Sequence, residues 1–384
     1  MPSTIVFLYA NDPNPGLLER MKTLHSSGRY EVHAIYWHRQ RSNITFPFST
    51  AIPQDRFHPI VLPDPRGSGL RRVVLTLRFL WMVRRLLRRI RPDGLHVVNA
   101  DMLGVARLVL LADPRRAALV YDMQDQMGDA LPWRYRWLYR WLLRRADAVL
   151  LRSDGFTHYV EKNALVRSST PVHYVANAPA GWTLIHRPRL DRRELVVGYF
   201  GNIRGAQLVQ ALVDAVTKVQ RSGRDVRILF AGVGPEAARV ARLADELDYV
   251  EYHGPYDYAT EYASLHDRAD LMYALYPQET PNYRTHIARR FHESILSGLP
   301  IVVTRDTQMG KIVREYGGGW EVRDGSVDEL VQLLSHIYDD RSELTRASAD
   351  EGLKQRHRFE TYEPLLLQTH DQALASRGIG ATPS

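Results

Sequence analysis

The sequence contains no cysteine. In a chain of 384 residues this absence excludes disulfide bonds, thiolate catalysis and cysteine-ligated metal sites, and it is typical of the reducing cytoplasm. No uninterrupted apolar run reaches the roughly 18 residues that a membrane-spanning helix needs. Residues 1–12 also lack the cationic start and the cleavage site of a signal peptide. We therefore expect a cytoplasmic protein whose chain does not cross a membrane.

Two common nucleotide-binding motifs are missing as well. The spacing G-x-G-x-x-G is absent after the first predicted strand, where NDPNPG stands, and no lysine follows a glycine loop in the Walker pattern. NAD-dependent dehydrogenases and P-loop NTPases are thus disfavoured. The composition, with 45% hydrophobic and 24% charged residues, is that of a globular protein. The chain is long enough for two domains.

Acidic residues are absent from two strongly basic segments, in a chain whose net charge is +8. Residues 71–91, from Arg71 to Arg91, hold eight arginines, and residues 133–145, from Trp133 to Arg145, hold five arginines and five aromatic residues. Arginine mixed with Trp and Tyr suits the headgroup region of an anionic membrane, so we predict contact with such a surface. One alternative remains open, that both segments are core-packed helices with solvated arginines. We expect no nucleic-acid partner, because no helix-turn-helix, zinc-knuckle or aromatic-sheet signature accompanies the charge.

Strand and helix patterns alternate in both halves of the chain, which predicts an α/β fold of two Rossmann-like, doubly wound parallel sheets. We expect an N-terminal domain over residues 1–177, a linker over 178–194 and a second domain over 195–358, with 341–356 as its last helix. A further helix over 359–376 is expected to pack back on the first domain, and residues 377–384 to form a disordered tail. Ligands of such sheets bind outside the carboxyl ends of the strands, so we expect the site in a cleft between the domains.

The stretch RRFHESILSGLPIVVT, residues 289–304, joins a helical pattern to a β-branched strand pattern. Gly298 and Pro300 end the helix before the strand begins. Glu293 is the one acidic residue of this helix. Two interpretations remain open for it. It is either a charge favoured by the positive end of the helix dipole, or a ligand for ribose or sugar hydroxyls, since a buried carboxylate needs partners.

Three glycine-rich turns end predicted strands in the second half, at residues 198–202, 231–235 and 252–256. Gly201, Gly232 and Gly234 permit tight turns and a close approach of the backbone. Glycine turns at helix N-termini bind phosphate groups through backbone N–H groups. Three such turns at one edge of one sheet predict a phosphate-binding edge, and Tyr256 belongs to the last of them.

The second half resembles the donor-binding domain of retaining glycosyltransferases with the GT-B fold, in family 4 (glycosyl transferases group 1). The resemblance rests on four motifs in order: VVGYFGNIRG, RILFAGVGPE, the stretch from VEYHGP to YALYP, and RRFHESILSGLPIVVT. The first half is similar to the same family in NDPNPG with its following helix, in DAVLLRSDG and in VHYVANAP. The resemblance extends over roughly residues 1–360.

The resemblance implies a binding site for a nucleoside-diphosphate sugar. The family's helix glutamate matches Glu293, which would bind the ribose hydroxyls and act in catalysis. A basic residue three positions earlier matches Arg290, a candidate diphosphate ligand. Arg204 is a second candidate, although the lysine that often accompanies it in the family is absent, so that Arg289 or Arg290 would substitute. The remaining expected donor ligands are Gly16, Gly201, Asn202, Gly232, Gly234, Tyr256 and Arg284.

One position departs from the pattern of the family. Many members carry a second glutamate eight positions before the first, where this chain has Thr285. A subgroup with a single glutamate and a longer loop fits better, and Asn282, Tyr283 and Arg284 stand in that loop.

The resemblance also implies that the first half binds the acceptor. The histidine that members place at a strand end is absent, and Asp101 and Asp122 stand near such strand ends instead. Each aspartate either caps the following helix or serves function. We predict capping for Asp101 and a catalytic role for Asp122. No metal and no cofactor is expected, because members of this kind need no metal and no Asp-x-Asp signature lies near a strand end.

The implied activity is a retaining, metal-independent glycosyltransferase on the inner face of the cell membrane. It would move a sugar from a nucleoside-diphosphate sugar to a lipid-linked or polysaccharide acceptor. Two alternatives remain: a nucleotide-sugar epimerase of the same fold, and a non-catalytic membrane-bound scaffold. Product formation without an acceptor would identify the epimerase, and intact nucleotide binding would argue against the scaffold.

Overall fold

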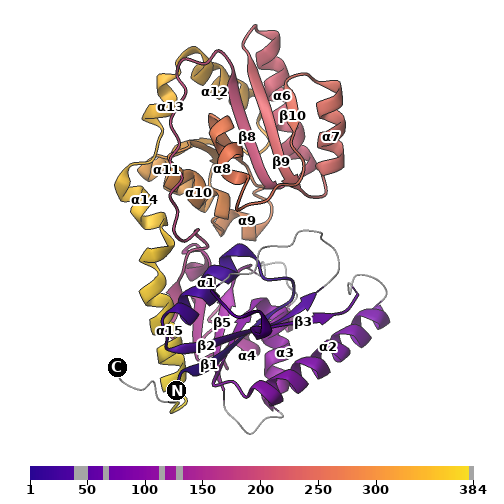
Figure 1. Cartoon of the computed structure of the whole chain (residues 1–384). Helices are drawn as coiled ribbons and strands as arrows, with labels where there is room; N and C mark the ends of the chain where they lie inside the picture. The colour runs from indigo at the N-terminus through magenta and orange to yellow at the C-terminus, as the bar shows by residue number, and fades with distance from the viewer. Residues whose placement is uncertain (39–50, 64–68, 112–116, 127–132, 380–384) are drawn as a thin grey trace. The chain divides into compact units, whose positions relative to one another are not determined.

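The computed structural model describes residues 1–38, 51–63, 69–111, 117–126 and 133–379 (Figure 1). Strands and helices alternate along this part of the chain, and the paired strands are parallel. The predicted fold class, two parallel α/β sheets, is therefore confirmed. The chain divides into two compact units, which we call unit 1 (residues 1–177 and 362–384) and unit 2 (residues 178–361).

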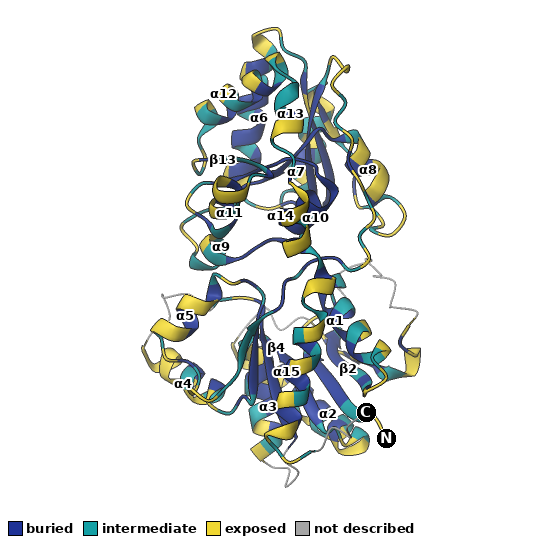
Figure 2. Ribbon diagram, turned by 90° about the vertical axis from the view of Figure 1, so that its left-hand side faces the viewer, coloured by how far each residue is buried: buried dark blue, intermediate teal, exposed yellow. Residues whose placement is uncertain are grey.

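Unit 1 contains a seven-stranded sheet in the order β3-β2-β1-β4-β5-β6-β7. Its strands are β1 (Ser3–Tyr9), β2 (Tyr30–His38), β3 (Phe57–Val61), β4 (Gly94–Val98), β5 (Ala118–Met123), β6 (Ala148–Leu151) and β7 (Val172–Tyr174). Its helices are α1 (Pro15–Ser26), α2 (Gly69–Ile90), α3 (Asn99–Leu111), α4 (Trp133–Leu143), α5 (Phe156–Lys162) and α15 (Glu363–Ala375). The central strands read as continuous apolar runs because helices cover both faces of a parallel sheet, and Figure 2 shows the strands buried beneath helices with exposed outer sides.

Unit 2 contains a six-stranded sheet in the order β10-β9-β8-β11-β12-β13. Its strands are β8 (Leu195–Asn202), β9 (Val226–Val233), β10 (Val250–Tyr252), β11 (Leu271–Ala274), β12 (Ile301–Thr304) and β13 (Gly319–Val322). Its helices are α6 (Ala206–Arg221), α7 (Ala237–Glu246), α8 (Tyr262–Arg268), α9 (Pro281–Thr285), α10 (Arg289–Ser297), α11 (Gln308–Tyr316), α12 (Val327–Asp339), α13 (Ser342–Arg346) and α14 (Glu351–His357).

Five short elements were not predicted from the sequence: β3, α5, α9, α11 and β13. The two missed strands are edge strands. One contains Pro59, which an edge position tolerates, and the other begins at the last of three consecutive glycines. The single helix predicted over residues 341–356 is wrong. Asp350 has an extended backbone, and its side chain accepts a hydrogen bond from the N–H of Leu353 at 2.7 Å, so it caps a new helix, α14.

The C-terminal helix α15 packs against β4, β5, β6 and α1 of unit 1. A buried polar chain accompanies this contact. Arg20 of α1 and His96 of β4 lie 3.3 and 3.1 Å from the same carboxylate oxygen of Asp122, and the other ring nitrogen of His96 lies 3.1 Å from His370 of α15. All four side chains are at most 1% exposed. After the helix, Arg377 forms an ion pair with Asp147 at 2.6 Å, and residues 380–384 of the predicted tail lie outside the described residues.

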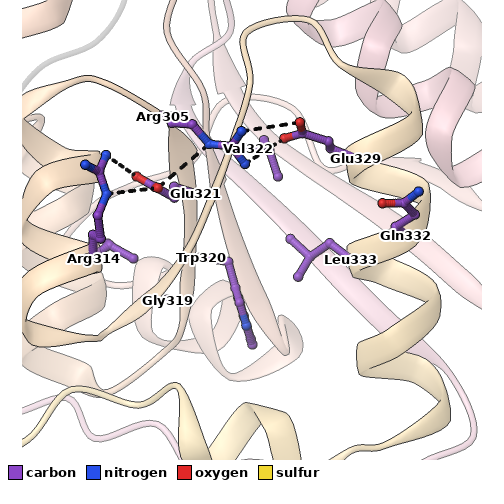
Figure 3. A pocket seen from close by; sticks show the side chains of 10 residues that line it. Arg305, Arg314, Gly319, Trp320, Glu321, Val322, Glu329, Gln332 and Leu333 are labelled. Atoms are coloured by element: carbon purple, nitrogen blue, oxygen red, sulfur yellow. Dashed lines mark hydrogen bonds and ion pairs between the residues drawn. The ribbon is translucent and has the colours of Figure 1, made fainter.

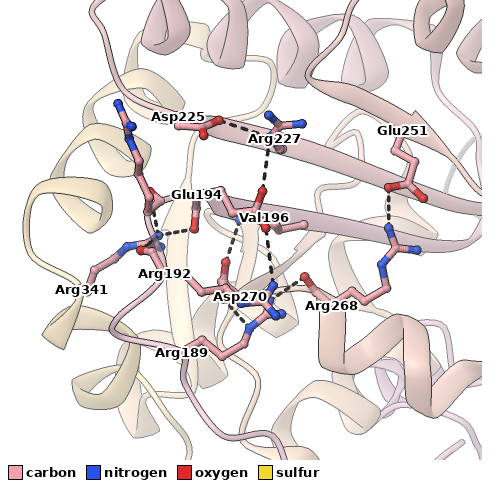
Figure 4. A network of polar contacts seen from close by, with 11 residues as sticks. Arg189, Arg192, Glu194, Val196, Asp225, Arg227, Glu251, Arg268, Asp270 and Arg341 are labelled. Atoms are coloured by element: carbon pink, nitrogen blue, oxygen red, sulfur yellow. Dashed lines mark hydrogen bonds and ion pairs between the residues drawn. The ribbon is translucent and has the colours of Figure 1, made fainter.

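Residues 178–193 have no helix or strand, yet they are held firmly on unit 2 (Figure 4). Arg189 forms an ion pair at 3.0 Å with Asp270, a fully buried carboxylate that also accepts a hydrogen bond from the N–H of Val196 at 2.8 Å. Arg341 donates to the carbonyl oxygens of Arg192, at 3.1 Å, and of Glu194. Polar contacts therefore take the place of regular secondary structure in this segment.

We expect Arg20→Leu to lower the free energy of unfolding of unit 1 by about 3–5 kcal/mol, because it leaves the buried Asp122 carboxylate without its cation. Arg29→Leu is the matched control, since Arg29 is half exposed and pairs with Asp371 at 3.0 Å on the surface; its loss should change the free energy by less than about 1 kcal/mol. Urea denaturation followed by circular dichroism measures both. Equal effects of the two substitutions would contradict the assigned role of the buried cluster.

Burial lowers the pKa of His266 in α8 to about 3, while one ring nitrogen lies 3.0 Å from the hydroxyl of Ser297. In the unfolded chain a histidine has a pKa of about 6.5, so the unfolded state takes up a proton first as the pH falls. The contribution of the neutral His266 side chain to the free energy of unfolding is therefore complete above pH 6.5. It falls by about 2 kcal/mol between that pH range and pH 5. Urea denaturation at pH 7.5 and 5 should show a smaller pH dependence in His266→Gln, and an unchanged dependence would refute the assignment.

Candidate active site

The three glycine turns lie together at the carboxyl edge of the unit 2 sheet. Gly201 at the end of β8 is paired in register with Gly232 at the end of β9, and the N–H of Gly232 donates to the carbonyl of Gly254, beyond β10, at 2.7 Å. The sequence-based expectation that these turns share one edge is therefore correct. Backbone groups of three neighbouring strands converge at this edge.

Close contact between two of the turns explains why glycine stands at two of these positions. Gly232 and Gly234 have φ angles of +132° and +151°. A Cβ atom at Gly232 would lie 1.9 Å from the carbonyl oxygen of Gly201, and one at Gly234 would lie 2.2 Å from that of Ile203. Any larger residue would push the β8 and β9 turns apart, so these glycines shape the edge whether or not they also touch a ligand.

Arg290 lies where the strand order of unit 2 reverses, between β8 and β11, which is the expected ligand position in a doubly wound sheet. Its guanidinium carbon is 4.8 Å from the ring centre of Tyr199 in β8 and 5.9 Å from that of Tyr276, which follows β11. One guanidinium nitrogen lies 3.5 Å from the carbonyl oxygen of Asn202. The aromatic faces hold this cation beside the first glycine turn.

Glu293 lies one turn further along α10 and is only 4% exposed. Its carboxylate accepts hydrogen bonds from the hydroxyls of Tyr258 at 2.5 Å and Tyr262 at 2.9 Å, and from Nε of Arg289 at 3.0 Å. Burial and the nearby Glu293 charge both raise the pKa of each tyrosine, so the two hydroxyls remain protonated and act as donors. The carboxylate is thus a fixed acceptor rather than a charge at a helix end.

Most of the hydrogen-bond acceptor positions of the Glu293 carboxylate are already used. A carboxylate offers about four lone-pair positions. Tyr258 and Arg289 both bind Oε1, whereas Tyr262 alone binds Oε2. One acceptor position therefore remains, on Oε2, and it suits a single hydroxyl donor.

Aromatic residues surround this pair of charged side chains, and the sequence patterns did not single most of them out. Tyr256 lies 6.0 Å from Tyr262 between ring centres, beside the Glu293 cluster. The ring centre of Tyr276 lies 5.4 Å from that of Tyr283 and 4.7 Å from that of His286. The only signal in the sequence was the density of tyrosine after the third glycine turn. The periodicity of a single helix or strand does not predict which side chains of separate loops come together.

The other predicted donor ligands of unit 2 lie in the turn after β8 and in α9. Arg204 is exposed, and its guanidinium lies 3.4 Å from the hydroxyl of Tyr283. Arg284 is exposed in the same short helix as Tyr283. Thr285, at the position of the missing glutamate, donates its hydroxyl to the carbonyl of Pro281 at 3.0 Å. Thr285 therefore holds the end of α9 together.

The candidates in unit 1 behave differently. Asp122 has no exposed surface, and Arg20, His96 and Gln124 all bind its Oδ2, whereas its buried Oδ1 has no hydrogen-bond partner among the described residues. The structure therefore gives Asp122 a structural role, as the partner of two buried basic side chains, and its predicted catalytic role stays a prediction. The Arg20 cation and the hydrogen bond from His96 outweigh the effect of burial and lower its pKa to about 2.

Asp101 and Gly16 lie at the carboxyl edge of the unit 1 sheet. Asp101 accepts a hydrogen bond from the N–H of Met102 at 2.9 Å. It is the third residue of α3 rather than the residue before the helix, so its predicted capping role stays a prediction. Gly16 lies in the first turn of α1, and a Cβ atom there would lie 1.7 Å from the side-chain oxygen of Asn177. Glycine is thus required for Asn177 to lie against the start of this helix. Within the described residues, no group of three or more His, Asp or Glu side chains is arranged to hold a metal ion.

Two family models match the chain in succession. The glycosyl transferase 4-like domain covers residues 16–178, and the glycosyl transferases group 1 domain covers residues 194–340. Comparison with curated protein sequences finds no significant match.

Solved structures share the fold along nearly the whole chain. HepE from Anabaena, in complex with UDP and glucose, is 18% identical with a TM-score of 0.68 and covers 97% of this chain and 100% of its own. Sucrose-phosphate synthase from Thermosynechococcus elongatus is 13% identical, with a TM-score of 0.69 and the same coverage. UDP-GlcNAc 2-epimerase from Neisseria meningitidis, bound to UDP-GlcNAc, is 10% identical with a TM-score of 0.65, over 95% of this chain and 99% of its own. At such identities the likeness shows the fold alone.

The family models distinguish between the transferase and the epimerase where the fold does not. Together they span both units, and both describe glycosyltransferase domains. The chain therefore belongs to the family 4 glycosyltransferases of the GT-B fold, enzymes that use a nucleotide sugar and typically retain its anomeric configuration.

Proposed function

We propose that the enzyme binds its nucleoside-diphosphate sugar at the carboxyl edge of the unit 2 sheet and transfers the sugar with retention, without a metal ion. The observation that carries this proposal is the pairing of Arg290 and Glu293 on one helix beside the first glycine turn. A cation suits the diphosphate, and a fixed carboxylate suits a ribose hydroxyl. The acceptor is proposed to be lipid-linked or a polysaccharide.

Arg290 is proposed to bind the diphosphate, assisted by Arg204 and Arg284. Negative charge grows on the departing phosphate as the sugar leaves through an oxocarbenium-like transition state. Cations and backbone N–H groups that are already in place stabilise that charge without reorganising. Guanidinium groups bind phosphate oxygens in a bidentate manner, which supports arginine in this role where the family often has lysine.

Glu293 is proposed to accept a hydrogen bond from one ribose hydroxyl, at the position left open on Oε2. Tyr258, Tyr262 and Arg289 then act as positioning residues, because they fix the carboxylate before the nucleotide arrives. Preorganisation of this kind lowers the entropy lost on binding. The three donors that already bind this carboxylate argue against Glu293 as the acid or base of an epimerase.

Unit 1 is proposed to contact an anionic membrane surface through α2, α3 and α4. Helix α2 is apolar on two sides: Leu75, Phe79, Val83 and Leu87 are buried, whereas Leu70, Val73, Val74, Leu77 and Trp81 are exposed. The exposed positions follow helical spacing, so they form a second apolar stripe that the core does not use. No helix of the described residues is long and apolar enough to cross a bilayer.

Helices α3 and α4 continue the same pattern. Both pack into the core cluster that α2 joins, and α3 contacts both α2 and α4. Leu108 and Leu111 of α3 are exposed, as are Trp133 and Trp137 of α4, which are 76% and 64% exposed. Exposed tryptophan between arginines supports insertion at the level of the lipid headgroups. The solvated-helix alternative explains the arginines but leaves these rings without a role.

Nucleotide binding tests the donor site directly. Thermal unfolding in the presence of UDP, GDP, dTDP, CMP or NAD should show stabilisation by one nucleoside diphosphate, since a ligand of the folded state raises its stability by mass action. In Glu293→Gln we expect that nucleotide to bind at least tenfold more weakly, and in Tyr262→Phe several-fold more weakly, because the carboxylate loses a fixing donor. Glu315→Gln, on the exposed surface of α11, is the control. Wild-type affinity in Glu293→Gln would refute the site.

Sedimentation with liposomes tests the membrane surface. Arg85→Glu with Arg88→Glu should reduce binding to vesicles rich in phosphatidylserine more than about tenfold, as each basic residue near such a surface contributes about 1 kcal/mol. The control reverses Arg221 and Arg242 in unit 2, which are also exposed and give the same change in net charge. Equal losses in both double variants would indicate a general charge effect and contradict a specific surface on α2.

A further inference from the structure

A groove of about 540 Å³ lies along β13, the edge strand of the unit 2 sheet (Figure 3). Helix α11 contributes Val313 and Arg314 to one wall, and α12 contributes Glu329, Gln332 and Leu333 to the other. The floor is the strand itself, with Trp320 and Glu321, and Arg305 closes the groove after β12. The groove is open to solvent rather than enclosed.

The charged groups of this groove are paired with one another. Arg314 binds Glu321 through two nitrogens, at 2.9 and 3.1 Å, and Arg305 binds Glu329 through two nitrogens, at 3.1 and 3.5 Å. Arg305 also lies 3.8 Å from Glu321. Arg323 also pairs with Glu329, and Asp306 lies 3.6 Å from Arg314, so three arginines and three acidic residues balance in charge. A nucleotide, a phosphate or another strongly charged ligand therefore finds no net attraction here.

The paired groups still offer many hydrogen-bond positions in fixed orientations. A guanidinium carries five N–H donors, of which a bidentate pair uses two. Glu329 offers no further acceptor position, because Arg305 and Arg323 together give it four hydrogen bonds, so the open positions belong to the arginines, Glu321 and Gln332. The side chains of Arg305 and Arg314 are 37% and 53% exposed, so their remaining donors face solvent. Gln332, which is exposed on α12, adds an amide that both donates and accepts. Such planar groups match vicinal hydroxyls.

Trp320 supplies the apolar part of the groove. Its indole is half-buried, packs on the unit 2 core with part of its surface, and lines the groove with another part, near Leu333. A sugar ring presents a face of C–H groups that carries slight positive charge, and an aromatic face carries negative charge. The Trp320 ring lies beside arginine–glutamate pairs that carry no net charge but still offer hydrogen bonds. Such a surface is complementary to a neutral saccharide.

We propose that the β13 groove is a second binding site, for a neutral oligosaccharide, distinct from the donor site. A chain held there by an enzyme that extends glycans would remain bound between transfers. The charged pairs have one competing explanation, since charges on a short edge strand also prevent it from pairing with other chains. That explanation accounts for Arg305, Arg314 and the glutamates, but it does not require a tryptophan or a hollow of this volume.

Isothermal titration calorimetry on the full chain tests the site with maltohexaose, cellohexaose, isomaltohexaose and mannohexaose. We expect at least one of them to bind, and Trp320→Ala to weaken that binding tenfold or more. Gln332→Trp is the second variant, because Gln332 is exposed, so the substitution fills the groove without touching the core. Ile185→Ala, which removes an exposed apolar side chain from unit 2 outside the groove, is the control and should bind as the wild type does.

Two results would overturn the proposal: no binding of any of the four oligosaccharides, or binding that survives both Trp320→Ala and Gln332→Trp. Either would leave protection of the sheet edge as the role of the ion pairs. The proposal is separable from that for the donor site. Oligosaccharide affinity should be unchanged in Glu293→Gln, and stabilisation by the nucleoside diphosphate should be unchanged in Gln332→Trp.

Discussion

A buried carboxylate needs cations or N–H and O–H donors around it to compensate for the loss of water. Three buried carboxylates hold segments that lie outside the two sheets. Asp122 joins α1 and β4 in the unit 1 core, and through His96 it reaches the C-terminal helix α15. Asp270 holds the irregular segment 178–193 on unit 2 through Arg189. Glu293 fastens the loop and helix that carry Tyr258 and Tyr262 to α10. Each carboxylate joins parts of the chain that are distant in sequence, because no local donor set suffices to compensate a buried charge.

The third of these carboxylates connects structure with chemistry. The partners that make its burial tolerable also fix its direction, and they leave one acceptor position open. Arg290, three residues earlier on the same helix, is held by aromatic faces rather than by an acid. Its charge therefore stays available for an anionic ligand. One short helix thus presents a cation and an acceptor side by side at the point where the strand order reverses.

The surface of unit 1 is notable for exposed apolar side chains rather than for buried carboxylates. Core-facing positions of α2 account for one apolar stripe, and the exposed stripe on the same helix has no protein partner within the described residues of the chain. Arginines flank it, and Arg85 lies 5.9 Å from the ring of Trp81. An exposed apolar stripe flanked by arginines is the feature on which the proposed contact with a lipid surface rests.

The sequence by itself determined the fold class, because alternating periodicity dictates parallel sheets covered by helices. It also determined the glycine turns and the α10–β12 junction, where Gly298 ends the helix at a φ of +80°. Only the tertiary structure decided which polar residues are accessible. Asp122 and Glu293 are both acidic residues next to apolar runs. Asp122 has no exposed surface and lies between Arg20 and His96 in the unit 1 core, whereas Glu293 is 4% exposed and lies one turn from Arg290 on α10. The physical reason is that burial and pairing depend on partners that are distant in sequence, as for His96 and His370, which are 274 residues apart, and local patterns carry no record of them.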